Sequence, residues 1–212
     1  MPAAEAAAWR DGAQSGHARR VAVLRCIVAS MVVTVLLAGL AVLIFWLVVR
    51  PKPIDYAVTR AAVRHFNVTP PPGATVNATF YLTLAARNPN RRVSILYEWV
   101  EFRVLYGESY AQLALQDAPA FRQPPRNETR LGVRAVARSA PVGEQAAREL
   151  RHDLAAGAVG VDVRMRARAQ FKVAGVRSRR YSLEAFCSPV VVGLSPSAAR
   201  SFQSVPCDVA VS

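Results

Sequence analysis

The chain has 212 residues, of which 27 are Lys or Arg and 14 are Asp or Glu, and its formal net charge is +13. This length leaves room for one compact domain beside the apolar segment described next. A basic domain attracts polyanions, which outside a cell are acidic polysaccharides or lipid headgroups, so nucleic acid is excluded as the expected partner. The alternative is that biased codon usage explains the arginine content.

The N-terminal part of the chain contains an unbroken apolar run, Cys26 to Val49, without a charged residue. As a helix the run would span about 36 Å, enough to cross a hydrocarbon core of about 30 Å. It is longer than the apolar core of a cleaved signal peptide. We therefore predict an uncleaved signal-anchor: a transmembrane helix over residues 26–49, preceded by a disordered cytosolic tail over residues 1–25.

The orientation of this single-pass protein is predicted from features beyond the apolar run, because basic residues flank the run on both sides. Three Asn-x-Thr sequons, at Asn67, Asn77 and Asn127, all follow it and are candidate glycosylation sites. Cys187 and Cys207 also follow it, as a candidate disulfide pair. These features predict a C-terminal domain outside the cytosol at the plasma membrane, with an endomembrane as the alternative.

The cysteines differ in their expected roles. A bond between Cys187 and Cys207 would close a loop of about twenty residues and stabilise the domain by about 3 kcal/mol. Cys26 lies at the predicted cytosolic edge of the span. It is either a site of S-palmitoylation or a structural cysteine that faces lipid.

The segment after the span is predicted to consist mainly of β-strands. Residues 50–68 are expected to form a stalk that becomes an edge strand, and residues 69–212 a sandwich. Alternation of apolar and polar residues predicts strands over 76–84, 93–106, 110–115, 126–137, 159–173, 180–187 and 207–211. Helical spacing predicts one helix over 141–156, with Gly157 as its stop. The expected fold is mainly β: an antiparallel sandwich of immunoglobulin or fibronectin type with one short helix.

The predicted strand over residues 159–173 carries a basic stripe on one face. The stripe consists of Arg164, Arg166, Arg168 and Lys172. Neighbouring charges on one face of a strand lie about 7 Å apart, and a neighbouring strand could carry Arg130, Arg134 and Arg138. One interpretation is a face that binds a polyanion, either uronate-rich wall polymer or anionic lipid. The other is the solvent-facing side of a sheet.

The sharpest local motif is Asn88-Pro89-Asn90-Arg91-Arg92. It is either an exposed loop that offers amides and guanidinium groups to a partner, or a tight turn whose asparagine side chains bond nearby backbone groups. The chain shows no catalytic signature, and its three histidines lack metal-ligand spacing. The sequence therefore predicts no enzyme, no metal and no cofactor.

Several of these residues occur in the order typical of a known family. The matching positions are Asn88, Pro89, Asn90, Arg92, Ile95 and Tyr97. Together with a Phe-x-Gln segment that begins at Phe121 and the late cysteine pair, they resemble the plant harpin-induced-like and non-race-specific disease resistance-like family, which carries a late-embryogenesis-abundant group 2 (LEA-2) domain. The resemblance implies a membrane protein of plants associated with defence and abiotic stress, without enzymatic activity, and some relatives are discussed as linking plasma membrane and cell wall.

The functional expectation is therefore a non-enzymatic module, anchored in the lipid bilayer, that acts in defence and in recognition or adhesion between membrane and cell wall. Its expected partners are a wall polyanion or anionic lipid, and proteins at the membrane. The alternative expectation is a stress protein that protects membranes or binds lipid.

Overall fold

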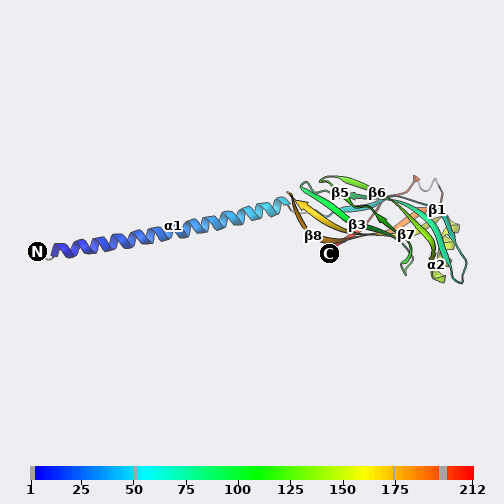
Figure 1. Ribbon diagram of the computed structural model, residues 1–212, viewed down its shortest axis with the longest axis horizontal. Coiled ribbons are helices and arrows are strands. Elements are labelled where there is room, and N and C mark those ends of the chain that lie inside the picture. The colour runs from blue at the N-terminus through cyan, green and yellow to red at the C-terminus, as the bar shows by residue number, and fades with distance from the viewer. Residues whose placement is uncertain (1–2, 50–51, 174, 196–199) are drawn as a thin grey trace. The chain divides into compact units, whose positions relative to one another are not determined.

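The computed structural model describes residues 3–49, 52–173, 175–195 and 200–212, and it divides into two compact units, Met1–Arg50 and Pro51–Ser212. The first unit is one continuous helix, α1 (Ala3–Val49) (Figure 1). Its segment Val21–Ile44 has 24 residues and a mean hydropathy of 2.8, so it is long and apolar enough to cross a membrane. The predicted N-terminal apolar helix is confirmed.

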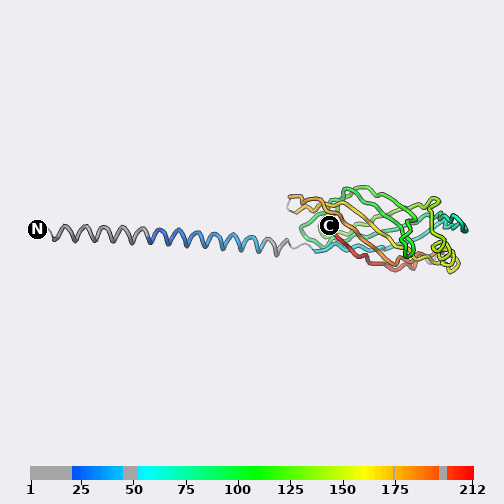
Figure 2. Tube along the Cα trace, turned by 90° about the horizontal axis from the view of Figure 1, so that it is seen from below, coloured from blue at the N-terminus to red at the C-terminus, as the bar shows by residue number. Residues whose placement is uncertain are grey.

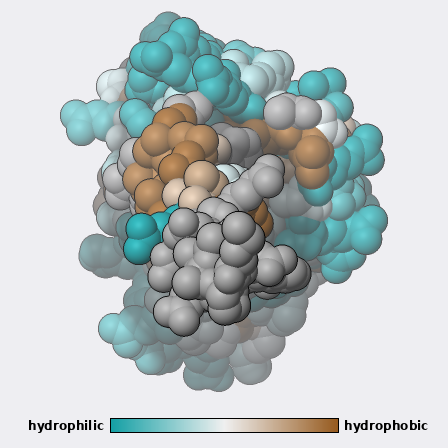
Figure 3. All heavy atoms as spheres, turned by 90° about the vertical axis from the view of Figure 1, so that its left-hand side faces the viewer, coloured by the Kyte–Doolittle hydropathy of each residue, from teal (hydrophilic) through white to brown (hydrophobic). Residues whose placement is uncertain are grey.

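The helix α1 also extends into the segment for which the sequence predicts a disordered tail, residues 1–25. It begins at Ala3, and five of the six residues from 3 to 8 are alanine, which has the highest intrinsic helix propensity. In the view of Figure 3, apolar side chains, in brown, lie nearer the centre, and hydrophilic side chains, in teal, lie mainly around the edge. Among the described residues, the exposed large apolar side chains come mainly from α1, between Val23 and Ile44.

The second unit is a sandwich of two antiparallel sheets that confirms the predicted fold (Figure 1). The four-stranded sheet has the order β6-β2-β1-β9, and the larger sheet has the order β10-β8-β7-β3-β4, with β5 also paired to β3. The strands of the first sheet are β1 (Asp55–Val68), β2 (Thr75–Arg87), β6 (Glu128–Pro141) and β9 (Val205–Pro206). Those of the second are β3 (Val93–Tyr106), β4 (Ala111–Ala118), β5 (Phe121–Gln123), β7 (Ala158–Val173), β8 (Val176–Gly193) and β10 (Asp208–Val211).

The first strand belongs to the sandwich rather than to a stalk. β1 pairs with β2 from Asp55 to Val68 and with β9 on its other side. The helix α2 (Glu144–Ala156) begins three residues later than the predicted start at residue 141, because β6 continues through Pro141. It ends as expected at Gly157, which adopts the left-handed conformation with φ of 82° that favours glycine at a helix C-terminus.

The core lies between the two sheets, and side-chain alternation sets which residues fill it. On β2 and β7, every second side chain points inward, and Phe80 and Met165 are among the largest fully buried ones. From β3, Tyr97 and Phe102 enter the same core, and Leu150 of α2 is also fully buried. The outer faces of both sheets therefore carry the polar residues of these strands.

The C-terminal segment crosses from one sheet to the other. β9 pairs with β1 and β10 pairs with β8, and Figure 2 traces the red C-terminal strand alongside the orange β8. Between them the backbone N–H of Cys207 donates to the carbonyl of Tyr56, with N and O 2.9 Å apart. Cys207 also forms a disulfide with Cys187 of β8, twenty positions earlier. The predicted cysteine pair is confirmed. The disulfide ties the crossing segment to β8, and the Cys207 N–H ties it to β1.

Candidate functional site

The predicted basic stripe lies on the outer face of β7, but an acidic neighbour shares part of its charge. Glu184 of β8 lies 3.1 Å from Arg164 Nε and 3.5 Å from Arg166 Nε, measured to its two carboxylate oxygens. On the adjacent β3, Arg103 donates to Glu101 at 2.6 Å, and Glu101 is the register partner of Arg166. Carboxylates of the neighbouring strands therefore flank Arg164 and Arg166, as expected for the solvent-facing side of a sheet.

The arginines expected beside this stripe lie on the other sheet. Arg130, Arg134 and Arg138 belong to β6, which pairs with β2 rather than with β7. The expectation of one combined basic face is therefore wrong. Its failure has a physical reason: alternation along a strand is local, whereas the choice of partner strand depends on contacts far apart in the sequence.

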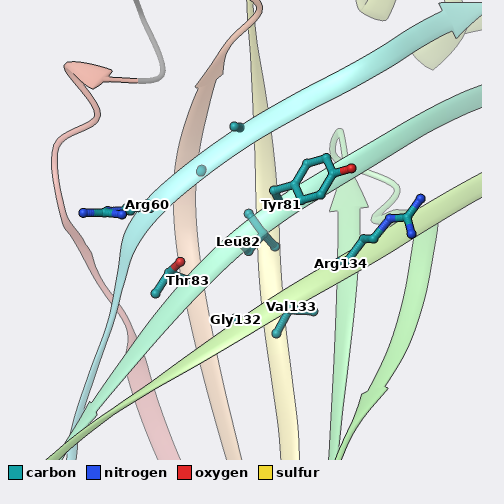
Figure 4. A pocket seen from close by; sticks show the side chains of 9 residues that line it. Arg60, Tyr81, Leu82, Thr83, Gly132, Val133 and Arg134 are labelled. Atoms are coloured by element: carbon teal, nitrogen blue, oxygen red, sulfur yellow. The ribbon is translucent and has the colours of Figure 1, made fainter. Parts of the chain in front are cut away.

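A second basic face is formed where β1, β2 and β6 lie side by side. Tyr81 of the middle strand is opposite Ala62 of β1 and Arg134 of β6, and Thr83 is opposite Arg60. These residues and Gly132 line a hollow of about 370 Å³. Figure 4 shows Tyr81 between Arg60 and Arg134, which come from the strands on either side of it.

This second face is basic without carboxylates among its paired segments. Residues 60–64, 79–83 and 132–136 contain three arginines and no Asp or Glu. The third arginine, Arg64, holds its guanidinium 5.7 Å from the centroid of the Tyr81 ring, within cation–π range. We call the surface formed by Arg60, Arg64, Tyr81, Gly132 and Arg134 the arginine–tyrosine face. Of these five residues, the sequence predicts only Arg134 as a candidate for binding. The local signal for Arg60 and Arg64 is their four-residue spacing on β1.

The asparagines of the Asn88-Pro89-Asn90 motif are buried and bond to backbone groups. The side-chain amide of Asn88 donates to the carbonyls of Val93, at 2.8 Å, and Pro124, at 3.1 Å. The side chain of Asn90 accepts from the N–H of Lys52 at 2.7 Å and donates to its carbonyl at 2.9 Å. These amides fix the start of the sandwich to the β2–β3 turn, whereas Arg91 and the motif residue Arg92 remain exposed.

The other motif residues lead into a buried polar network between the sheets. Ile95 and Tyr97 are buried on β3. The Tyr97 hydroxyl donates to Gln123 Oε1 at 3.2 Å and also bonds the hydroxyl of Tyr56 on β1. Gln123, with none of its surface exposed, donates to the carbonyls of Ala86 at 2.7 Å and Asn127 at 3.2 Å. This arrangement matches the turn interpretation of the motif and explains its Phe-x-Gln segment.

Burial of this network makes stability sensitive to alkaline pH. Burial raises the pKa of Tyr97 to about 12. The pKa of Tyr56 is raised more strongly, chiefly by burial and also by the neighbouring hydroxyl of Tyr97. Because the unfolded chain loses these protons near pH 10, stability is fully present below about pH 10 and is lost as pH rises toward about 12. Tyr97 alone is expected to remove about 1.4 kcal/mol per pH unit. Parallel phenolate absorbance and circular dichroism titrations check this: phenolate formation by every tyrosine near pH 10 in a folded protein would contradict it.

The remaining candidate residues lie apart from these clusters. Asn67 and Asn127 are exposed, and Asn77 is half-buried, with its side-chain oxygen accepting from the N–H of Ser139 at 2.8 Å. Asn67 and Asn77 are direct register partners across β1 and β2. Cys26 is an exposed free cysteine of α1. Within the part of the chain that the structure describes, no three His, Cys, Asp or Glu residues gather as a metal site.

Comparisons with known proteins agree with the motif. Residues 83–187 match the family model described as Late embryogenesis abundant protein, LEA_2. An uncharacterized protein of Arabidopsis thaliana is 33% identical over 189 residues, which are 89% of this chain and 84% of that protein. NDR1/HIN1-like protein 3 of the same plant is 29% identical over 86% of this chain and 79% of its own, and NDR1/HIN1-like protein 10 is 28% identical over 86% and 80%. The predicted resemblance is confirmed, and the chain belongs to the NDR1/HIN1-like family of plant proteins with a LEA-2 domain.

Proposed function

We propose that this chain is a non-enzymatic recognition module, held at the plasma membrane by α1, which presents its LEA-2 sandwich outside the cytosol. In this role it acts in defence and stress responses by binding a partner at the boundary between membrane and wall. Membership of the NDR1/HIN1-like family supports the defence context. The apolar segment Val21–Ile44 supports the anchoring.

One observation carries the placement outside the cytosol: the disulfide between Cys187 and Cys207. Disulfides persist in oxidising compartments and are rare in the reducing cytosol. Here the bond lies in the segment that joins the two sheets, so it contributes to the architecture of the domain. The three sequons all lie in this domain as well, and Asn67 and Asn127 are exposed.

Removal of N-glycans from the full-length protein made in plant cells is expected to increase its electrophoretic mobility. The Asn67→Gln, Asn77→Gln, Asn127→Gln triple variant is expected to show no such shift, because it lacks all acceptor sites. Protease added to intact microsomes is expected to leave the sandwich undigested. A digested sandwich, together with unchanged mobility of the native chain, would instead place the domain in the cytosol and leave the anionic inner leaflet as its partner.

A further inference from the structure

The arginine–tyrosine face differs in charge balance from the basic stripe on the opposite sheet. On β7, Arg164 and Arg166 share the carboxylate of Glu184. Among the described residues, Arg60, Arg64 and Arg134 have no ion-pair partner within 4.0 Å. Since paired charges attract a further anion less strongly, the stronger anion-binding site is expected where the guanidinium groups lack carboxylates.

The shape of this face favours an extended ligand. Arg60 and Arg64 lie on the same side of β1, about 13 Å apart along the strand. Arg134 lies on β6, about 10 Å away across the sheet, because β2 separates the two strands. The face therefore has positive charge on both sides of a neutral central strand that carries Tyr81. This arrangement of charges fits a linear polyanion that lies along β2.

The surroundings of Tyr81 favour a sugar ring. Its side chain is 38% exposed, and its register neighbour on β1 is Ala62, whose small side chain leaves the hollow open. Gly132 extends the opening, since a Cβ placed there would meet no heavy atom within 4 Å. An exposed aromatic ring provides an apolar surface on which the C–H face of a pyranose packs, while the guanidinium forks bind carboxylates.

We propose that the arginine–tyrosine face binds a carboxylated polysaccharide, a polymer of uronic acid residues that lies along β2. The sugar rings stack on Tyr81 in the hollow above Gly132, and successive carboxylates bind Arg60, Arg64 and Arg134. This inference rests on the proposed placement of the sandwich outside the cytosol, where such polymers occur. The proposed site lies on the sheet of β1, β2 and β6 and not on the β7 stripe.

The test is binding of an oligogalacturonate to the full-length protein in nanodiscs of neutral phosphatidylcholine. The Arg60→Gln, Arg64→Gln, Arg134→Gln variant is expected to lose at least about tenfold in affinity. Its matched control is Arg164→Gln, Arg166→Gln, Arg168→Gln, which removes the same net charge from β7 and is expected to change affinity less than about twofold. The affinity of the native protein is expected to fall steeply with added salt, because salt screens the attraction between guanidinium groups and carboxylates. The methyl-esterified oligomer is expected to bind poorly, because its carboxylates are uncharged esters.

A second pair of variants tests the hollow without changing charge. Gly132→Leu fills the hollow and is expected to weaken binding, whereas Gly160→Leu places the same side chain in open space on β7 and is expected to leave binding unchanged. Equal losses in both arginine variants would overturn the proposal, as would full displacement of the oligomer by vesicles containing phosphatidylserine, which would make the face a lipid site. Because this assay does not depend on topology, its failure is distinguishable from failure of the glycan and protease experiment.

Discussion

Replacing Gln123 with methionine is expected to lower the free energy of unfolding of the sandwich by about 2–4 kcal/mol. Methionine has nearly the same volume, so the packing changes little, but it cannot replace the amide. The carbonyls of Ala86 and Asn127 lose a donor, and the buried hydroxyl of Tyr97 loses its acceptor. Thermal unfolding of the full-length protein in detergent is expected to occur about 5–15 °C lower.

The control is the same substitution at a glutamine outside the core. Gln112 on β4 is exposed, so Gln112→Met is expected to change the unfolding free energy by less than about 0.5 kcal/mol. A Gln123→Met variant as stable as Gln112→Met would show that the buried network contributes no net stability. The expected difference instead assigns the Phe-x-Gln segment a structural role. The Gln123 amide joins β5 to β2 and β3, and the Tyr97 hydroxyl continues the network to Tyr56 of β1.

The elements of this fold were predictable wherever the signal was local. Strict alternation from Val159 to Val173 identified β7, and helical spacing up to Gly157 identified α2. The two short strands β5 and β9, of three and two residues, were not predicted, because so few residues cannot show a period. In the N-terminal segment for which the sequence predicts disorder, the structure has the helix α1 from Ala3, in keeping with the high helix propensity of alanine.

The candidate site was less predictable, because it depends on which strands become neighbours. The sequence correctly predicts that the stripe lies on one face of β7. Its carboxylate partner Glu184 is on β8, and only the register between β7 and β8 shows that the two are neighbours. Likewise, Arg60 and Arg134 are 74 positions apart, and only the pairing of β2 with both β1 and β6 places them around Tyr81. The sequence therefore predicts a basic domain and the stripe on β7, whereas the grouping of Arg60 and Arg134 around Tyr81 follows only from the strand pairing.

Removal of the disulfide by Cys207→Ser is expected to destabilise the sandwich by about 3 kcal/mol. The bond closes a loop over twenty positions, so without it the unfolded chain gains conformational freedom that the folded state does not share. The folded structure is also expected to change near the bond, because Cys207 lies between β9, which pairs with one sheet, and β10, which pairs with the other. Without the bond, β9 is held to the outer edge of β1 by few contacts, and that edge is expected to open first.

Thermal unfolding with and without a reducing agent measures this effect. The reduced native protein is expected to unfold at the same temperature as Cys207→Ser, and Cys26→Ser to behave as the oxidised native protein, since Cys26 is free. If reduction left the native protein unchanged while Cys207→Ser unfolded early, the loss would come from the serine and not from the missing bond. Because β1 carries Arg60 and Arg64, loosening of its outer edge is also expected to weaken oligogalacturonate binding, which links the oxidation state of the domain to its proposed ligand.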